Sequence, residues 1–369
     1  MQKDNTCKYN NILVDAVMHL GDLIHATTII PLLKSTFPGT KVSFLVPSNL
    51  VEVFDLIDDV EYVIPYSYKS GRDYFNVYKM AQKIKKYNFD LSISLDPRMR
   101  LSSMMWLAGI PTRVGSPSVF GWEPGLEKIF FSDYVKFYDY DIRKHSAAEN
   151  FQQLIRIFAN LGNVDSDNFI RPFFKKADPS SDKYVGDILA DLHKDNIKIA
   201  LCVKTVDEAR NWDPDNFSKI IKKLNSSYSC DFVFVGVNGD KDSIEKICSG
   251  VGKDDNLFHA EGRTNLKQLN ALLRKMDFLV NLDNGMGHFA AAAGCPTVTI
   301  FSNADPWKFK PLHEKTKIVF CACDCRENCN KHSRKKCNYE CLNSININDV
   351  YKNVVLLIKD MQNDSWEIK

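Results

Sequence analysis

Two glycine-containing turns hold the residues whose types and spacing could do chemistry. The first, His19-Leu-Gly-Asp22, lies between an apolar run and a helical pattern. The second, Asp283-Asn-Gly-Met-Gly-His288, has the same surroundings late in the chain. In a parallel α/β sheet, ligands bind beyond the carboxyl ends of the strands, where a helix N-terminus offers free N–H groups and glycine lets an anion approach the backbone. We therefore expect both turns to bind anionic groups.

Each of these residues also has a purely structural interpretation. Asp22 is of a type favoured at a helix N-cap, Asp283-Asn-Gly suits a tight turn, and His288 suits a satisfied core histidine. Taken alone, Arg210 would be a solvated charge and Trp212 a core residue. Their joint occurrence and order are therefore more informative than any one of them. Neither turn is a Walker loop or a GxGxxG fingerprint.

A cluster of cysteines is the second candidate for chemistry. Six of the 11 cysteines lie between residues 321 and 341, and Cys325, Cys329, Cys337 and Cys341 form two pairs, each with three intervening residues. Two close pairs of thiolates suit a tetrahedral metal site, and in a reducing cytosol this favours metal before disulfide. The cluster predicts one structural zinc or iron ion, with a set of free thiols as the alternative.

Alternating strands and helices must position these turns. We predict strands at 11–16, 41–46, 62–65, 91–95, 197–203, 231–237, 278–281 and 297–301. We predict helices at 22–34, 50–57, 74–86, 147–161, 214–224, 242–249, 265–275, 289–293 and 348–361. This alternation predicts the α/β class, with parallel sheets covered by helices on both faces. The segment 97–141 is less regular, and such stretches often carry binding loops.

Length and pattern together predict two domains in 369 residues. The first covers 1–165, a polar linker covers 166–183, the second domain covers 184–345, and a C-terminal helix and tail cover 346–369.

Composition limits the partners. The formal net charge is only +2, so the overall charge gives no indication that the protein binds nucleic acid. No run reaches the roughly 20 apolar residues that a membrane span needs, and the polar residues 1–10 lack a signal core. We expect a cytoplasmic protein, with peripheral contact at the inner face of the inner membrane left open.

The order of the motifs resembles that of glycosyltransferase family 9, the heptosyltransferase-like enzymes, over nearly the whole chain. The most specific match is Asp283 to Pro296, which is similar to the family's Asp-Thr-Gly-x-x-His signature. Arg210-Asn-Trp212 resembles its basic-x-Trp element. The other matching runs are 12–31, 37–46, 107–115 and 301–306.

The resemblance implies a GT-B fold, in which two facing Rossmann-like domains bind the acceptor and the nucleotide-sugar. It implies that Asp22 is the general base of an inverting transfer that needs no cofactor. The donor-binding residues that it implies are Thr205, Arg210, Asp283, Asn284, Gly285, Gly287 and His288. Arg210 stands where a lysine is usual, and Asn284 where a threonine is usual. An arginine keeps the charge and can grip phosphate through two N–H groups.

The resemblance further implies ADP-heptose as donor and a lipopolysaccharide inner core as acceptor. His25, Arg98, Arg100 and Arg113 are then assigned to the acceptor, although the arginines also fit plain surface charges. A branch of the family that glycosylates autotransporter adhesins has an iron-binding cysteine motif, so a protein acceptor is the main alternative. A non-catalytic nucleotide-sugar-binding protein and a dehydrogenase are the remaining ones, and the oligomeric state stays open.

Overall fold

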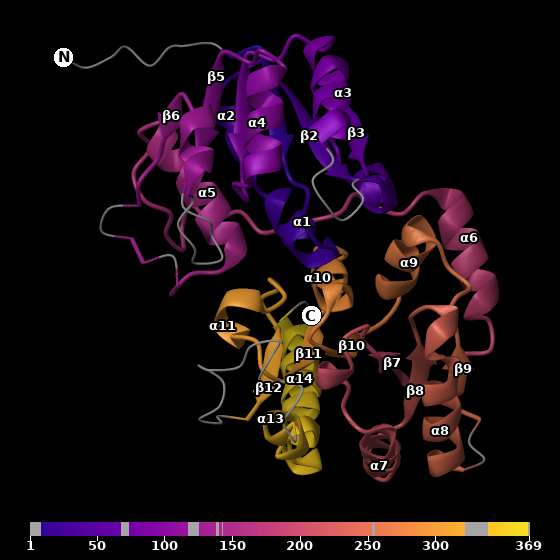
Figure 1. Ribbon diagram of the computed structural model, residues 1–369. Coiled ribbons are helices and arrows are strands. Elements are labelled where there is room, and N and C mark those ends of the chain that lie inside the picture. The colour runs from indigo at the N-terminus through magenta and orange to yellow at the C-terminus, as the bar shows by residue number, and fades with distance from the viewer. Residues whose placement is uncertain are drawn as a thin grey trace. The chain divides into compact units, whose positions relative to one another are not determined.

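The computed structural model describes residues 9–67, 74–116, 125–137, 140–141, 143–252, 255–321 and 339–367. The chain divides into two compact units, Met1–Pro172 (unit 1) and Phe173–Lys369 (unit 2). Each unit contains one six-stranded sheet, and Figure 1 shows helices packed around both. The division lies inside the segment 166–183 predicted as the linker, and helix α6 (Pro179–Ile188) begins within that segment.

The sheet of unit 1 is parallel throughout. Its strands are β1 (Asn11–Asp15), β2 (Lys41–Pro47), β3 (Val63–Tyr66), β4 (Leu91–Ser94), β5 (Thr112–Gly115) and β6 (Asp133–Tyr134). They lie in the order β3-β2-β1-β4-β5-β6. The interior of β1 is fully buried, as expected for a strand covered on both faces. The order reverses between β1 and β4, so the edge beyond Asp15 and Ser94 is the topological switch point.

The helices of unit 1 form two groups. Helices α1 (Leu20–Ala26) and α2 (Ile29–Thr36) contact α5 (Ala147–Phe158), whereas α3 (Tyr74–Lys85) packs against α4 (Met99–Leu107). Right-handed crossovers place the two groups on opposite faces of the sheet. Two 3₁₀ helices, η1 (Ser48–Leu56) and η2 (Leu126–Phe130), complete the unit, and η2 contacts α4.

The sheet of unit 2 repeats the architecture without repeating the sequence. Its strands are β7 (Ile197–Cys202), β8 (Cys230–Phe234), β9 (Leu257–His259), β10 (Phe278–Leu282), β11 (Thr297–Phe301) and β12 (Lys317–Phe320). All pairs are parallel, in the order β12-β11-β10-β7-β8-β9. The order reverses between β7 and β10, which places the switch point of this sheet beyond those two strands.

Helices cover both faces of this second sheet as well. They are η3 (Glu208–Arg210), α7 (Pro214–Asn225), η4 (Asn238–Asp240), α8 (Lys241–Val251), α9 (Leu266–Leu273), α10 (Gly285–Ala292), α11 (Pro306–Phe309), α13 (Glu340–Asn343) and α14 (Ile347–Glu367). Helix α14 packs against α7, β11 and β12. Among the described residues, none of the helices is long and apolar enough to span a lipid bilayer.

The predicted α/β class with two parallel sheets is confirmed, but several element predictions are wrong. The helix predicted at 22–34 is two helices, because the hydroxyls of Thr27 and Thr28 bond the carbonyls of Ile24 and His25 at 2.7 Å. Pro31 then falls in the first turn of α2, where its missing N–H has no cost.

Two further errors concern strands that weak patterns concealed. The strand at 297–301 is not the last, because the half-buried β12 follows it at the sheet edge. In the segment 97–141, the sequence indicates a helix that ends at Gly109, and α4 ends close to that residue, but the strands β5 and β6 were not predicted. Strand β5 is short and carries the polar Thr112 and Arg113, so it lacks the apolar run that marks β1.

Candidate functional site

Asp22 lies in the first turn of α1, at the edge of the unit 1 sheet that is formed by the carboxyl ends of its strands. The turn that follows β1 ends at His19, which is the N-cap of this helix and makes no side-chain capping bond. The interpretation of Asp22 as the N-cap is therefore wrong. The Asp22 side chain is half-buried, and its place in the first helical turn favours the negative charge. It is thus a carboxylate held at the switch point of the sheet.

A buried pair of carboxylates lies at the ends of the neighbouring strands. Asp15, the last residue of β1, is 1 % exposed, and Asp96, which follows β4, is 2 % exposed. The Ser94 hydroxyl donates to Oδ2 of Asp15 at 3.2 Å, and the N–H of Val17 also bonds this carboxylate. Burial, followed by repulsion from Asp96, raises the pKa of Asp15 to about 7. The sequence analysis missed both residues, although an acidic residue at the end of an apolar strand was the available signal.

The four residues predicted for the acceptor have different surroundings. His25 is 1 % exposed. Arg98 is paired with Asp96, with its Nη2 2.5 Å and its Nε 2.7 Å from Oδ2 of that residue. Arg100 is half-buried in the first turn of α4. Arg98 and Arg100 thus follow β4 at the same sheet edge as Asp22.

Arg113 is bound to the backbone instead. Its guanidinium donates to the carbonyls of Phe130 at 2.6 Å, Ile110 at 2.5 Å and Pro111 at 3.0 Å. These bonds tie β5 to η2. An arginine engaged in this way has fewer N–H groups left for a ligand.

In unit 2, the switch point brings Arg210 and Asp283 together. Arg210 ends η3 after β7, and Asp283 directly follows β10, the strand paired with β7. Nη1 of Arg210 lies 3.1 Å from Oδ2 and 3.3 Å from the carbonyl oxygen of Asp283. Its Nε lies 3.5 Å from Oδ2 of Asp207. The Asp283 side chain is 6 % exposed and that of Arg210 is 30 % exposed. The buried carboxylate therefore holds the guanidinium in place, while part of the Arg210 side chain remains accessible to solvent.

The second turn caps helix α10. Asn284 is the N-cap, and its Oδ1 accepts the N–H of Met286 at 3.0 Å, while its Nδ2 donates to the carbonyl of Lys204 at 3.3 Å. Gly285 is the first residue of the helix. A Cβ on Gly287 would lie 2.6 Å from Nδ2 of Asn281, so only glycine lets α10 pack this closely.

Thr205 belongs to the loop after β7. Its hydroxyl donates to the carbonyl of Asp207 at 2.7 Å, and its N–H donates to Asn211 at 2.6 Å. Trp212 is 2 % exposed and packs edge-on against Phe217, so its structural interpretation as a core residue is confirmed.

Burial sets the protonation states in unit 2. It lowers the pKa of His288 to about 4, so this imidazole is neutral at pH 7. It also raises the pKa of Asp283, an effect that the Arg210 charge opposes. The thiol of Cys202, whose pKa burial raises to about 11, stays protonated beside Asn284. Arg210 therefore supplies the positive charge of this group.

Most of the predicted metal site lies outside the described residues, because Cys325, Cys329 and Cys337 all fall in the segment 322–338. Cys341 is described: it is 4 % exposed and belongs to the core of unit 2. Within the described ranges, no three His, Cys, Asp or Glu side chains are grouped so that they could hold a metal ion.

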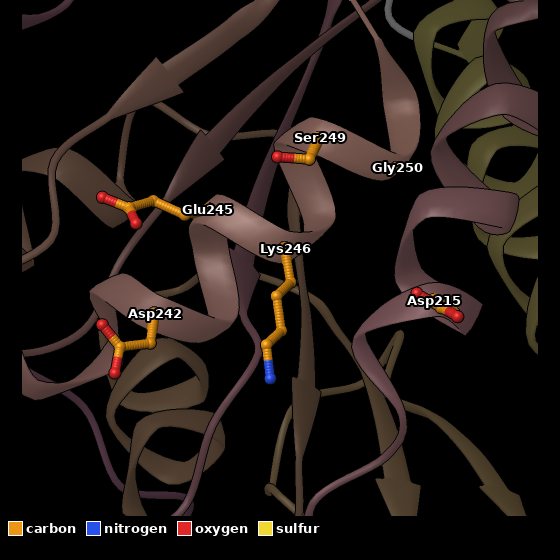
Figure 2. Close-up of a pocket in the computed structure, with 6 residues that line it drawn as sticks. All are labelled: Asp215, Asp242, Glu245, Lys246, Ser249 and Gly250. Atoms are coloured by element: carbon orange, nitrogen blue, oxygen red, sulfur yellow. The ribbon is translucent and has the colours of Figure 1, made fainter.

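A cavity of about 650 Å³ opens on unit 2 beside α7 and α8. Its lining residues are Asp215, Asp242, Glu245, Lys246, Ser249 and Gly250 (Figure 2). None of them was predicted as a site residue, and all lie on helices rather than on the loops beyond β7 and β10.

The comparisons with known proteins agree with this architecture. The sequence model of glycosyltransferase family 9 (heptosyltransferase) matches residues 77–342. The chain is 20 % identical to the lipopolysaccharide core heptosyltransferase OpsX of Haemophilus influenzae over 307 residues, which cover 81 % of each protein.

Solved structures show the same fold. A family 9 glycosyl transferase from Veillonella parvula superposes with a TM-score of 0.78 at 20 % identity, covering 98 % of this chain and 99 % of that one. The ADP-heptose lipopolysaccharide heptosyltransferase II of E. coli gives 0.76 at 16 % identity, covering 95 % and 99 %. The iron-containing dodecameric glycosyltransferase TibC of enterotoxigenic E. coli gives 0.56 at 13 % identity, covering 96 % and 77 %.

Two Rossmann-like units, each with one parallel six-stranded sheet, make up the GT-B fold. The chain belongs to glycosyltransferase family 9, the heptosyltransferases.

Proposed function

We propose that this enzyme transfers heptose from ADP-heptose to a lipopolysaccharide inner-core acceptor, with inversion at the anomeric carbon. The observation that carries the proposal is the Arg210–Asp283 pair beyond β7 and β10. It supplies one fixed, partly exposed cation beside the start of α10, which suits a diphosphate. The ADP-heptose donor of the E. coli relative and the lipopolysaccharide core specified for the H. influenzae relative support the same reaction.

In this proposal unit 1 binds the acceptor and unit 2 binds the donor. Asp22 accepts the proton of the acceptor hydroxyl as that oxygen forms its bond to the anomeric carbon. The bond between this carbon and the diphosphate oxygen breaks, and ADP leaves with both electrons of that bond. Arg210 and the N–H groups at the start of α10 stabilise the charge that develops on the diphosphate, and the Thr205 hydroxyl does so once it turns from the Asp207 carbonyl to the ligand.

The neighbouring residues have supporting roles. Asp283 holds the guanidinium of Arg210 in place, and Asn284 fixes the start of α10. Gly285 keeps the backbone at the start of α10 accessible, Gly287 lets α10 pack closely against Asn281, and the neutral His288 supports the donor loop. Arg98 and Arg100 are proposed to meet the anionic groups of the acceptor, while His25 and Arg113 act through packing and the backbone.

The test is the Asp22→Asn variant with ADP-heptose and a heptose-free core acceptor. We expect turnover to fall about 10²–10⁴-fold, because general-base loss typically has this effect, while ADP affinity stays within about threefold. Glu52→Gln, an exposed acid on η1, is the matched control. A turnover of Asp22→Asn within about threefold of the wild type would rule out Asp22 as the base.

A protein acceptor is the second candidate. The cysteine spacing in 321–341 favours it, since an iron-containing glycosyltransferase is among the solved structures of this fold. Mass spectrometry that offers the enzyme ADP-heptose with either a lipid core or an adhesin polypeptide separates the two. If the enzyme consumed no ADP-heptose with either acceptor, and no other nucleotide-sugar was consumed, a non-catalytic nucleotide-sugar-binding protein would be favoured.

A further inference from the structure

The exposed apolar side chains of unit 1 are concentrated on one layer of helices. Among its described residues, the large hydrophobic side chains that are exposed lie on α3, α4 and η2, apart from Tyr62 and Leu161. They are Tyr74, Phe75, Tyr78, Met99, Trp106, Leu126 and Ile129. Phe75 is 77 % exposed and Leu126 is 71 % exposed. Isolated exposed apolar residues are common, but a group confined to one layer marks an interaction surface.

The helices point these side chains away from the sheet. The inner face of α3 carries Val77, Ala81 and Ile84, and the inner face of α4 carries Leu101, Met104 and Met105, which all join one core cluster with the sheet. The opposite row of α3 begins at Phe75 and continues through Lys79, Gln82 and Lys86 at helical spacing. The opposite row of α4 contains Met99 and Trp106, seven positions apart.

The two rows belong to one surface. Helices α3 and α4 pack against each other, and η2 packs against α4. The Trp106 ring lies 5.8 Å from that of Phe130 at the end of η2. We call the exposed side of α3, α4 and η2 the α3–α4 face.

This face is also basic. Lys79, Lys83, Lys85 and Lys86 are all exposed on α3 or directly after it, and α3 contains no acidic residue. Lys128 adds a further exposed cation on η2, beside the half-buried Glu127. The formal charge of the whole chain is only +2, so these lysines are a local concentration.

We propose that the α3–α4 face docks on an anionic lipid surface. Aromatic rings and long cationic side chains occupy the region between lipid headgroups and acyl chains, and lysines are attracted to anionic headgroups. The cores of protein–protein interfaces, in contrast, are depleted in lysine. The combination of exposed aromatic side chains and lysines on the α3–α4 face therefore favours a lipid partner. Docking requires neither the donor nor the acceptor and can therefore fail or succeed independently of the proposed reaction.

The test measures sedimentation of the full-length protein with vesicles. One set contains phosphatidylethanolamine with about one third phosphatidylglycerol, and the other contains only zwitterionic phosphatidylcholine. We expect binding to the anionic vesicles alone, and weaker binding as salt is added, since salt screens exposed charges.

Two double variants separate the contribution of the lysines to vesicle binding from that of the aromatic side chains. Lys79→Gln with Lys83→Gln should lower the partition coefficient about 30-fold, from the usual contribution of one lysine near an anionic membrane. Phe75→Ser with Tyr78→Ser should lower it about tenfold. The matched controls are Lys219→Gln with Lys222→Gln, which are exposed on α7, and Leu161→Ser, which is exposed elsewhere on unit 1. Melting curves check that each variant is folded.

Several results would overturn the proposal. They are the absence of vesicle binding, equal binding to both vesicle types, or unchanged binding in both double variants. If the wild type fails to bind vesicles but self-associates, and Phe75→Ser with Tyr78→Ser abolishes that association, the face is an interface between protein molecules.

Discussion

Replacement of Asp15 by asparagine should make the enzyme more stable at pH 8 and leave it nearly unchanged at pH 5. Asp15 ends β1 with 1 % of its surface exposed, and its pKa is raised from 3.8 to about 7, first by burial and then by Asp96. A group whose pKa is higher in the folded state keeps a proton that the unfolded chain releases. The stability therefore falls as the pH rises from about 4 to about 7, and the whole loss remains above that range.

The size of the effect follows from that interval. The difference between 3.8 and about 7 corresponds to on the order of 4 kcal/mol at pH 8. An asparagine has no charge to desolvate, but it faces two donors, the Ser94 hydroxyl and the Val17 N–H. Because the buried Oδ1 of Asp15 has no hydrogen-bond partner, the NH₂ group of an asparagine would lack one at that position too, and about 1 kcal/mol is lost again. We expect a net gain of about 3 kcal/mol at pH 8.

Urea unfolding followed by circular dichroism between pH 5 and pH 8 measures this quantity. Since the protein has two units, the curves are fitted with two transitions, and the change should be confined to one of them. Glu52→Gln serves as the control for removal of an exposed carboxylate. An equal gain at pH 5 and pH 8, or a pH dependence in Asp15→Asn as steep as in the wild type, would refute the reasoning.

Three further predictions concern unit 2. Arg210→Ala and Asp283→Ala should each weaken ADP binding about tenfold or more in calorimetric titration, and an unchanged Kd in both would remove the donor site from this edge. Buried Asp231 raises the pKa of His193 through a 2.9 Å bond, so this contact stabilises the fold below pH 6.5 and is lost as the pH rises through the raised pKa. His193→Ala should thus lower Tm more at pH 6 than at pH 8.5, and an equal drop would contradict this. Protein purified without chelator should contain about one equivalent of zinc or iron at the cysteines of 321–341 and melt lower after chelation; less than about a tenth of an equivalent would identify them as free thiols.

The sequence alone was sufficient to predict those elements that depend on residues close together in the chain. The apolar run of β1 identifies a strand without any knowledge of distant residues. The helix predicted at 289–293 exists, but it begins four residues earlier, at Gly285, because the Asn284 side chain caps it there. The pairing of Asp15 with Ser94 could not be predicted in this way, because the partners are 79 residues apart and meet only when β1 and β4 pair.

Arg113 illustrates the same limit for a candidate site residue. An arginine in an irregular stretch fits contact with an acidic ligand, and its sequence neighbours do not show what else it could bind. In the fold, η2 brings the carbonyl of Phe130 within 2.6 Å of its guanidinium. Thr27 is the local counterpart: the helix break that it helps to cause depends on a bond to a carbonyl three residues away, so closer attention to the Thr-Thr pair and Pro31 would have found it.

Both switch points keep an arginine engaged with a buried carboxylate, Arg98 with Asp96 and Arg210 with Asp283. In each pair the arginine side chain stays partly exposed, 37 % for Arg98 and 30 % for Arg210. An anion can therefore bind the exposed part of the guanidinium while the carboxylate keeps its partner, and no buried carboxylate is left without its cation, which would be costly. Each cation is already held in one orientation before a ligand arrives, so ligand binding loses little side-chain entropy at these two positions.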